Sequence, residues 1–482
     1  MKKPTDLIES NKRSTAVVNY GLNNHILYDE LYRRVHATAN RLHRYGLDQG
    51  SIVACRIRPS VDFGIIYFAG VIHGLSILPV SPGLPENELD RLLREYSVDY
   101  LINGTSLEMN RNLPVETVAP DDLVTVEDPG TLPADNSREH RLLIKTSGTT
   151  GDPKLVELTW ENMIASARAS RRRLGVRDDD VWVSPLPTNH VGGIAPYVRS
   201  LVNGTAVAPI NSDPESILLS LTETNATAIS LVPTMLRDLL DRGLQGDQTR
   251  LRFILLGGAP AEETLVDEAL DRGLPVRTTY GMTETASQVA TASPSLLQEH
   301  PGTVGQPLDG ITVRIDAGSG DSAKAGETGE IVVDGPMVAE GYWSASSEDD
   351  GFSTVGYRTG DIGYMDEQNR LWVVGRKDRL IISGGENIHP ANVETAIESL
   401  EYVSKASVLG IESDRWGQKV VACIVPSDSG SLDSSLVKGK LEDELPPHKV
   451  PKEVYPLDEL PRTETGTINL DELRQTIRNR SK

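Results

Sequence analysis

Cysteine is scarce in this chain: 482 residues contain two, Cys55 and Cys423, which are far apart in the sequence. Neither has a histidine or second cysteine at metal-site spacing, so we expect neither a disulfide framework nor a zinc site. The N-terminus, Met-Lys-Lys-Pro-Thr-Asp, lacks the apolar stretch of a signal peptide. A reducing compartment fits this cysteine usage best, and we expect a cytoplasmic protein.

Long uninterrupted hydrophobic runs are also missing. The longest apolar stretch, residues 61–80, contains Asp62, His73 and Pro79 as well as three glycines. These residues argue against a membrane span and predict a buried helix followed by a strand.

Basic residues are outnumbered: 69 Asp and Glu face 48 Lys and Arg, which gives a net charge of −21. A phosphate backbone would be repelled by this excess, so a nucleic-acid partner is not expected. Acidic runs such as residues 178–180 and 442–444 look like surface segments. We hypothesise a halophilic protein, because high salt screens the mutual repulsion of many carboxylates.

The length of 482 residues predicts two or more domains. Residues 15–293 alternate helical patterns with short Val/Ile/Leu runs, which predicts parallel sheets covered by helices. Glycine-punctuated short strands then predict a β-rich section at about 302–375. The charged run 376–379 marks a hinge. We therefore predict an α/β fold, with a large N-terminal domain (1–377) followed by a small α+β C-terminal domain (378–482).

The most informative segment is Thr-Ser-Gly-Thr-Thr-Gly-Asp-Pro-Lys at residues 146–154. Glycines let backbone N–H groups approach phosphate oxygens, and hydroxyls add donors without bulk. The preceding run 141–145 predicts a strand, and a helix is predicted to open at Thr159. The spacing is not that of the common P-loop, and the alternative is a Ser/Thr/Gly linker. The candidate phosphate-binding residues are Thr146, Ser147, Gly148, Thr149, Thr150, Gly151 and Lys154.

Three further clusters follow predicted strands or lie in predicted turns: 257–260, 280–285 and 357–361. In the second, the Tyr280 ring can stack on a purine, Thr283 can donate to a phosphate, and Glu284 can hold Mg²⁺. In the third, Asp361 can accept hydrogen bonds from both ribose hydroxyls. Any one cluster alone fits an ordinary turn, but four in this order favour nucleotide chemistry.

With these motifs, nearly the whole chain resembles the adenylate-forming superfamily of acyl-CoA synthetases, adenylation domains and luciferases. The resemblance implies that the protein uses ATP and CoA as substrates and Mg²⁺ as a cofactor. It also implies that Asp361 and Arg376 bind the nucleotide, that Asp378 is the pivot of a mobile C-terminal domain, and that Gly384 and Gly385 lie on its thioester-forming face. The remaining nucleotide-binding residues that it implies are Gly258, Ala259, Tyr280 and Gly281.

Within the superfamily, the segments 255–261, 280–288 and 380–388 resemble the o-succinylbenzoate–CoA ligases of menaquinone biosynthesis. His190 stands where acyl-CoA synthetases keep a histidine beside the acyl carboxylate. Arg199 lies in a segment that otherwise predicts a buried helix, where a guanidinium is costly unless it meets an anion. That anion is either the second carboxylate of the substrate or an internal Asp or Glu. The candidate residues for the acid are His190, Arg199, Gly257 and Ser287.

One residue departs from the family pattern. The family's C-terminal motif ends in Gly-Lys, and Thr467 occupies the place of this lysine. A hydroxyl cannot supply the field of a cation to a departing pyrophosphate. Either another cation substitutes, with Arg462, Lys449 and Arg474 as candidates, or the first half-reaction is slow.

The sequence thus predicts an AMP-forming acid–CoA ligase with Lys154, His190, Thr283 and Glu284 as catalytic residues. Two alternatives stay open: a CoA ligase for another aryl or short- or medium-chain acid, and a nucleotide-binding protein that has lost catalysis. The oligomeric state also stays open, with a homodimer as one candidate.

Overall fold

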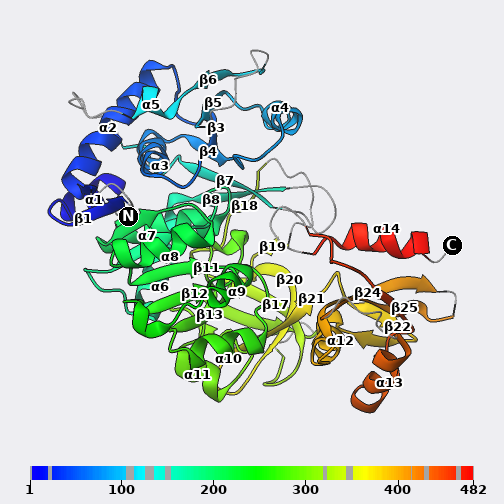
Figure 1. Ribbon diagram of the computed structural model, residues 1–482. Helices are drawn as coiled ribbons and strands as arrows, with labels where there is room; N and C mark the ends of the chain where they lie inside the picture. The colour runs from blue at the N-terminus through cyan, green and yellow to red at the C-terminus, as the bar shows by residue number, and fades with distance from the viewer. Residues whose placement is uncertain are drawn as a thin grey trace. The chain divides into compact units, whose positions relative to one another are not determined.

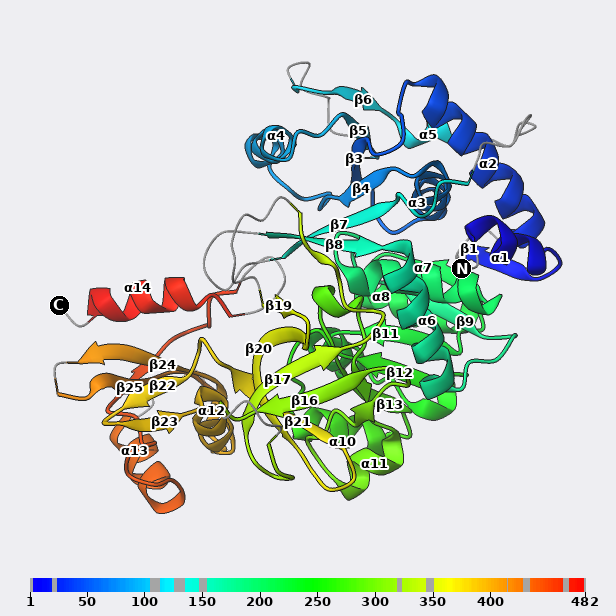
Figure 2. The ribbon, with the colours of Figure 1, turned by 180° about the vertical axis from the view of Figure 1, so that it is seen from behind.

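The structure is a computed structural model that describes residues 3–19, 24–104, 113–124, 135–146, 154–318, 323–343, 351–413, 415–427, 434–462 and 468–480 (Figures 1 and 2). The chain forms two compact units. The larger contains Met1–Val313, Val332–Tyr357 and Asn369–Leu371, and the smaller contains Arg314–Ile331, Arg358–Gln368 and Trp372–Lys482. A domain boundary between residues 377 and 378 stays a prediction.

The larger unit contains a nine-stranded sheet in the order β15-β14-β13-β12-β11-β9-β10-β1-β2. Its strands are β1 (Thr15–Asn19), β2 (Asn24–Leu27), β9 (Val181–Ser184), β10 (Ala206–Pro209), β11 (Ala228–Leu231), β12 (Phe253–Leu256), β13 (Val276–Tyr280), β14 (Ala290–Thr291) and β15 (Gln306–Pro307). The six strands from β13 to β1 in this order pair in parallel. Their carboxyl ends therefore meet at one edge, where α/β proteins bind ligands.

Helices cover this sheet because its strands are apolar on both faces. Ile254 and Leu256 pack with α8 (Pro214–Glu223), α9 (Pro233–Asp241), α10 (Glu263–Asp271) and α11 (Pro294–Glu299). The alternate residues Phe253 and Leu255 pack with Leu174 at the end of α6 (Trp160–Leu174). The predicted parallel sheet covered by helices is confirmed.

A second sheet of the larger unit has the order β18-β8-β7-β4-β3-β5-β6. Its strands are β3 (Ile52–Arg56), β4 (Ser76–Pro79), β5 (Tyr100–Asn103), β6 (Glu116–Val118), β7 (Arg141–Thr146), β8 (Lys154–Thr159) and β18 (Gly341–Tyr342). Helix α4 (Glu86–Glu95) packs Leu89, Leu92 and Leu93 against one face of it (Figure 2). The remaining helices of this part are α1 (Pro4–Ser10), α2 (Tyr28–Arg44), α3 (Val61–His73) and α5 (Pro120–Leu123). The run 61–80 forms α3 and β4, as predicted.

The segment after residue 146 contains one element that was not predicted. The helix predicted to open at Thr159 is found there, but β8 lies between it and the phosphate-binding segment and pairs antiparallel with β7, from Arg141↔Thr159 to Thr146↔Lys154. Helix α6 then begins after Thr159, whose hydroxyl accepts from Asn162 N in a reciprocal cap. The strand forms because Leu155, Val156 and Leu158 are buried beside β7.

Strands dominate the described residues between 302 and 376, as predicted. A sheet of order β16-β17-β20-β19, with β21 beside β20, is built from β16 (Thr312–Asp316), β17 (Gly329–Asp334), β19 (Phe352–Ser353), β20 (Gly356–Met365) and β21 (Leu371–Arg376).

The smaller unit ends in a sheet of order β23-β22-β25-β24, with β26 beside β25. Its elements are β22 (Ile381–Ser383), β23 (Glu386–Ile388), α12 (Pro390–Glu398), β24 (Val403–Ser413), β25 (Gly417–Pro426), α13 (Ser434–Glu444), β26 (Glu453–Pro456) and α14 (Leu470–Arg480). Val393 and Ile397 of α12 pack on one face together with α13, whereas Leu473 and Ile477 of α14 pack on the other (Figure 1). This arrangement is the predicted small α+β domain.

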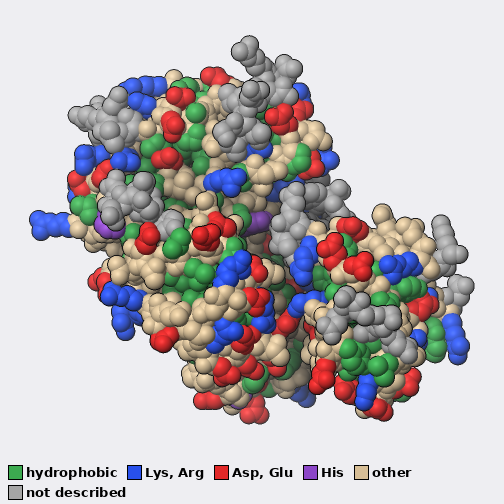
Figure 3. Space-filling view, in the orientation of Figure 1, with side chains coloured by type: hydrophobic (Ala, Val, Ile, Leu, Met, Phe, Trp, Pro, Cys, Tyr) green, Lys and Arg blue, Asp and Glu red, His purple; other side chains and the backbone are tan. Residues whose placement is uncertain are grey.

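Two further predictions concern the surface and the cysteines. Within the described ranges, no helix combines the length and apolar character required to cross a membrane. Cys55 and Cys423 are both buried and unbonded. Asp and Glu side chains are scattered over the face seen in Figure 3, between Lys and Arg.

Candidate active site

The ends of the predicted phosphate-binding segment lie side by side. Thr146 ends β7, and its hydroxyl donates to the backbone oxygen of Lys154 at 3.3 Å. The Nζ atom of Lys154 lies 4.9 Å from the centre of the Tyr342 ring. The β7–β8 pairing therefore holds the candidate cation at the mouth of this segment.

A tight turn follows β13 at the ligand-binding edge of the nine-stranded sheet. A Cβ atom at Gly281 would lie 1.6 Å from Ser287 O, so only glycine fits there. Ala286 and Ser287 both have positive φ angles, 48° and 100°. Such strain persists where surrounding bonds enforce it, and Ser166 Oγ donates to Ala286 O at 2.7 Å. Strain of this kind is concentrated at binding sites.

The turn directs Glu284 toward two tyrosines. The Glu284 side chain is largely buried and accepts from the Tyr342 hydroxyl at 2.9 Å. The Tyr342 and Tyr357 hydroxyls are 3.0 Å apart. Tyr342 was absent from the predicted site residues, and its place in the segment Glu-Gly-Tyr-Trp offered no obvious signal.

Other predicted residues lie at the same sheet edge. Gly257 follows β12, and its N–H donates to Leu231 O at the end of β11. Gly258 and Ala259 come next and are exposed. Tyr280, the last residue of β13, is buried. The parallel register thus gathers the predicted acid- and nucleotide-binding residues of these two strands.

Arg199 is one of the largest fully buried side chains, with 2% of its surface exposed. It lies on α7 (Val191–Asn203) and donates through Nη2 to Ser287 Oγ at 3.0 Å. Its guanidinium carbon lies 5.1 Å from the centre of the Trp182 ring, and its Nε is buried without a hydrogen-bond partner among the described residues. Burial lowers the pKa of Arg199 to about 9. No Asp or Glu in the described ranges pairs with it, so the internal salt bridge is not found there.

His190 is the N-cap residue of α7, the helix that carries Arg199. Its Nε2 lies 3.3 Å from Asn189 Nδ2, and burial lowers the pKa of its imidazole. A histidine with a lowered pKa is neutral at pH 7 and can donate one hydrogen bond to a carboxylate.

Residues 358–361 of the predicted ribose turn lie in the smaller unit, whereas Tyr357 ends a segment of the larger unit. The buried Asp361 carboxylate accepts from Arg376 Nη1 at 3.2 Å, and the same nitrogen donates to Thr359 O at 3.1 Å. Arg376 Nε also donates to Asp378 at 3.4 Å. Burial opposes the charge on Arg376, but Asp361 and Asp378 outweigh it and raise the pKa of this side chain. The predicted nucleotide-binding pair is therefore preassembled.

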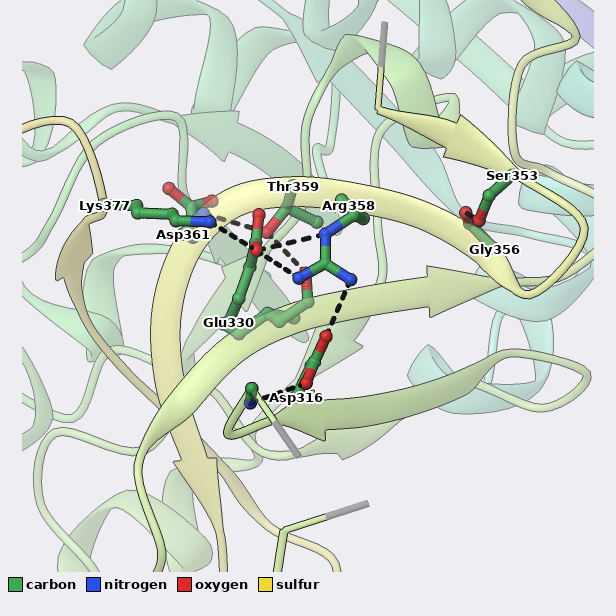
Figure 4. A network of polar contacts seen from close by, with 10 residues as sticks. Asp316, Glu330, Ser353, Gly356, Arg358, Thr359, Asp361 and Lys377 are labelled. Carbon is green, nitrogen blue, oxygen red and sulfur yellow. Dashed lines mark hydrogen bonds and ion pairs between the residues drawn. The ribbon is translucent and has the colours of Figure 1, made fainter. Parts of the chain in front are cut away.

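A second network, around the buried carboxylate of Glu330, includes Lys377, which directly follows Arg376 in the chain (Figure 4). Glu330 accepts from Arg358 Nη2 at 2.6 Å and from Lys377 Nζ at 3.0 Å. Arg358 also donates to Asp316 at 2.7 Å. These four residues, unforeseen in the sequence, join β16, β17 and β20 to the segment directly after β21.

Gly384 and Gly385 form the turn between β22 and β23, where Ser383 pairs with Glu386. Both have positive φ angles, 61° and 90°, as a two-residue hairpin turn of this type requires. Gly384 N donates to Trp416 O at 2.8 Å. The turn is thus fixed against β25.

Comparison with known proteins assigns the chain to a family. A model of the AMP-binding enzyme family matches residues 7–343, and one of the AMP-binding enzyme C-terminal domain matches residues 392–467. The chain belongs to the AMP-binding enzyme family.

Relatives of this AMP-binding enzyme include named ligases. The 2-succinylbenzoate–CoA ligase of Bacillus cereus (strain AH820) is 35% identical over 462 residues, which cover 94% of each chain. The o-succinylbenzoate CoA synthetase of Bacillus subtilis, solved with the acyl-adenylate intermediate OSB-AMP, is similar at a TM-score of 0.88, 29% identity and 98% of each chain. The same enzyme solved with ATP and a magnesium ion gives a TM-score of 0.86 at 29% identity, over 97% of this chain and 99% of that one.

The described residues suit ATP with Mg²⁺. No cluster of three or more His, Cys, Asp or Glu side chains within the described ranges could hold a metal ion alone. Glu284 is a single buried carboxylate in the predicted metal position. Mg²⁺ in nucleotide sites is bound by one or two carboxylates together with phosphates and water, so one carboxylate of this AMP-binding enzyme fits the ion.

Some predicted residues fall outside the described ranges, namely Ser147, Gly148, Thr149, Thr150, Gly151 and Thr467. Of the three cations considered in place of the family lysine, Arg474 pairs with Asp471 at 3.1 Å. Lys449 donates its backbone N–H to Pro446 O at 2.9 Å. Which cation serves stays a prediction.

Proposed function

We propose that this chain is an AMP-forming acid–CoA ligase that converts 2-succinylbenzoate (o-succinylbenzoate) to its CoA thioester in menaquinone biosynthesis. Family membership and the ligases named above support the reaction type. The observation that carries the choice of acid is Arg199, a buried guanidinium that no described acid neutralises. A dicarboxylate can place its second carboxylate there.

In the first half-reaction, a carboxylate oxygen of the acid attacks the α-phosphorus of ATP. The bond from that phosphorus to the bridging oxygen breaks, and pyrophosphate leaves with the electron pair. Lys154 and Thr283 neutralise and orient the phosphates, since a tetra-anionic nucleotide otherwise repels the acid. Mg²⁺ held by Glu284, when bound, adds charge compensation.

In the second half-reaction, the CoA thiolate attacks the carbonyl carbon of the acyl-adenylate. The carbon–oxygen bond to AMP breaks, and AMP leaves as a phosphate anion. We assign Gly384 and Gly385 to the face that admits CoA, and Asp378 to the pivot between the domains 1–377 and 378–482.

The acid is held, in this proposal, by His190, Arg199, Gly257 and Ser287. His190 donates to the carboxylate that is activated, and Arg199 binds the distant carboxylate in a bidentate way. The nucleotide is held by the hydroxyls and glycines of residues 146–151 and by Tyr280, Gly281, Gly258 and Ala259. Asp361 and Arg376 bind the ribose.

The remaining proposals concern the cell. We place the protein in the cytoplasm of a salt-adapted organism, because it combines two buried free cysteines with a net charge of −21. A homodimer is the assembly that we would test first, by light scattering.

A panel of acids tests the function. Purified protein is given ATP, Mg²⁺ and CoA with 2-succinylbenzoate, benzoate, and short- and medium-chain fatty acids, and AMP release is measured. We expect the highest kcat/KM for 2-succinylbenzoate. A higher value for another acid would establish the alternative ligase, and no AMP release with any acid would favour a nucleotide-binding protein without catalysis.

A further inference from the structure

Tyr342 lies between two predicted catalytic groups that are distant in the sequence. Its hydroxyl donates to Glu284 Oε1 at 2.9 Å, and its ring faces Lys154 Nζ at 4.9 Å. Lys154 is the first residue of β8, and Glu284 lies in the turn after β13. The strands β8 and β13 belong to different sheets. One side chain therefore touches both the candidate metal carboxylate and the candidate phosphate-binding lysine.

The backbone around Tyr342 is fixed to both neighbours. Tyr342 pairs with Val156 where β18 adds antiparallel to β8. Three residues earlier, Ala339 N donates to Glu284 O at 2.8 Å. Asn162 Nδ2 in the first turn of α6 donates to Val338 O at 2.9 Å. These bonds hold the tyrosine at a set distance from β8 and from the Glu284 turn.

The hydroxyl and the ring have separable contacts. Since the Tyr342 hydroxyl donates its hydrogen to Glu284, its oxygen accepts a hydrogen bond from the Tyr357 hydroxyl, 3.0 Å away. The Phe352 ring packs edge-on against the Tyr342 ring, with the ring centres 5.4 Å apart, and is tilted against the Tyr357 ring, with the centres 4.5 Å apart. The phenol is thus held by an aromatic neighbour while its oxygen aligns the carboxylate.

We propose that Tyr342 is a positioning residue with two parts: its hydroxyl orients the Glu284 carboxylate for Mg²⁺, and its ring holds the Lys154 ammonium for the phosphates. The inference rests on the proposed function. Partners that orient a metal ligand commonly affect metal affinity about 10- to 100-fold. An ammonium over an aromatic face is stabilised by the ring quadrupole.

Two variants separate the parts. Tyr342→Phe removes the hydroxyl and keeps the ring, whereas Tyr342→Leu removes both. Affinity for ATP is measured by calorimetry with and without Mg²⁺, and Mn²⁺ binding to the ATP complex is followed by electron paramagnetic resonance. Tyr67→Phe is the matched control, because it makes the same change in the larger unit at a buried hydroxyl with no hydrogen-bond partner among the described residues.

We expect Tyr342→Phe to weaken Mn²⁺ binding about 10-fold and to leave metal-free ATP affinity unchanged. Tyr342→Leu should weaken both, and Tyr67→Phe neither. Unchanged Mn²⁺ affinity in Tyr342→Phe, or an equal loss of ATP affinity with and without metal, would overturn the proposal. Both readouts are independent of the acid. Wild-type protein that binds Mg²⁺ and ATP but activates no acid would therefore disprove the ligase assignment without disproving the role of Tyr342.

Discussion

The buried charge of Arg199 leads to a prediction in which stability and activity change in opposite directions. Arg199→Met replaces the guanidinium by an apolar side chain of similar length. Removing an unneutralised buried charge should stabilise the ligand-free protein, and removing the anion partner should weaken binding of a dicarboxylic acid. If the role of Arg199 were purely structural, its replacement would not combine higher stability with weaker binding of the acid.

The magnitude follows from the surroundings of the side chain. Burial lowers the pKa of Arg199 to about 9. Since a tenfold change in proton affinity is worth about 1.4 kcal/mol, the charged form costs about 5 kcal/mol. The substitution also loses the hydrogen bond to Ser287 and the contact with Trp182, together about 3 kcal/mol. The net gain in the free energy of unfolding is therefore about 2 kcal/mol.

The direction of the pKa shift also predicts how the stability gain of Arg199→Met depends on pH. The cost is fully present below the folded-state pKa and decreases as the pH rises above about 9, because the folded protein then loses the proton. The gain of Arg199→Met should accordingly be larger at pH 7 than at pH 10. Urea unfolding of both proteins at the two pH values measures it.

The functional half of the prediction is a KM for 2-succinylbenzoate that rises about 10- to 100-fold, since a charge-assisted hydrogen bond is worth about 1.5–3 kcal/mol. The KM for ATP should stay within about twofold. Arg252→Met is the matched control: Arg252 pairs with the buried Asp180, so its loss should destabilise the protein and leave the KM of the acid unchanged. Lower stability of Arg199→Met, or equal rises in both KM values, would refute the reasoning.

Three other predictions concern charges elsewhere. Thr467→Lys should speed acyl-adenylate formation, measured by pyrophosphate exchange, because it restores a cation; an unchanged rate would mean that another residue already supplies the charge. Burial raises the pKa of Glu330, but hydrogen bonds from Lys377 and Arg358 lower it more, so it lies below its ordinary value. The stability that Glu330 contributes is present at neutral pH and lost as the pH falls below about 4, so Glu330→Gln should flatten the acid side of the thermal-midpoint profile; parallel profiles would contradict this. KCl should raise the urea midpoint of the wild type because it screens the net charge of −21, and a flat or falling curve would argue against salt adaptation.

Local signals predicted much of the fold. Thr159 with Asn162 marked the start of α6, and the interrupted apolar run 61–80 indicated α3 and β4. Strand β8 was missed because a strand depends on the partner that it pairs with more than on its own residues. Its partner β7 lies on the far side of the phosphate-binding segment.

Side-chain contacts were harder to foresee. The burial of Arg199 followed from its helix, but the absence of an acid beside it within the described ranges is a property of packing. Glu330 and Lys377 are 47 residues apart, and Tyr342 and Glu284 are 58 apart. Such pairs leave no local pattern in one sequence.

The most direct test of the central claim is mass-spectrometric detection of the product. Protein is incubated with 2-succinylbenzoate, ATP, Mg²⁺ and CoA, and the CoA thioester, AMP and pyrophosphate are quantified together. We predict one AMP and one pyrophosphate for each thioester formed. When CoA is omitted, we predict acyl-adenylate and pyrophosphate without thioester. ATP consumption that yields ADP, or the absence of both thioester and adenylate from protein that binds ATP, would contradict the account.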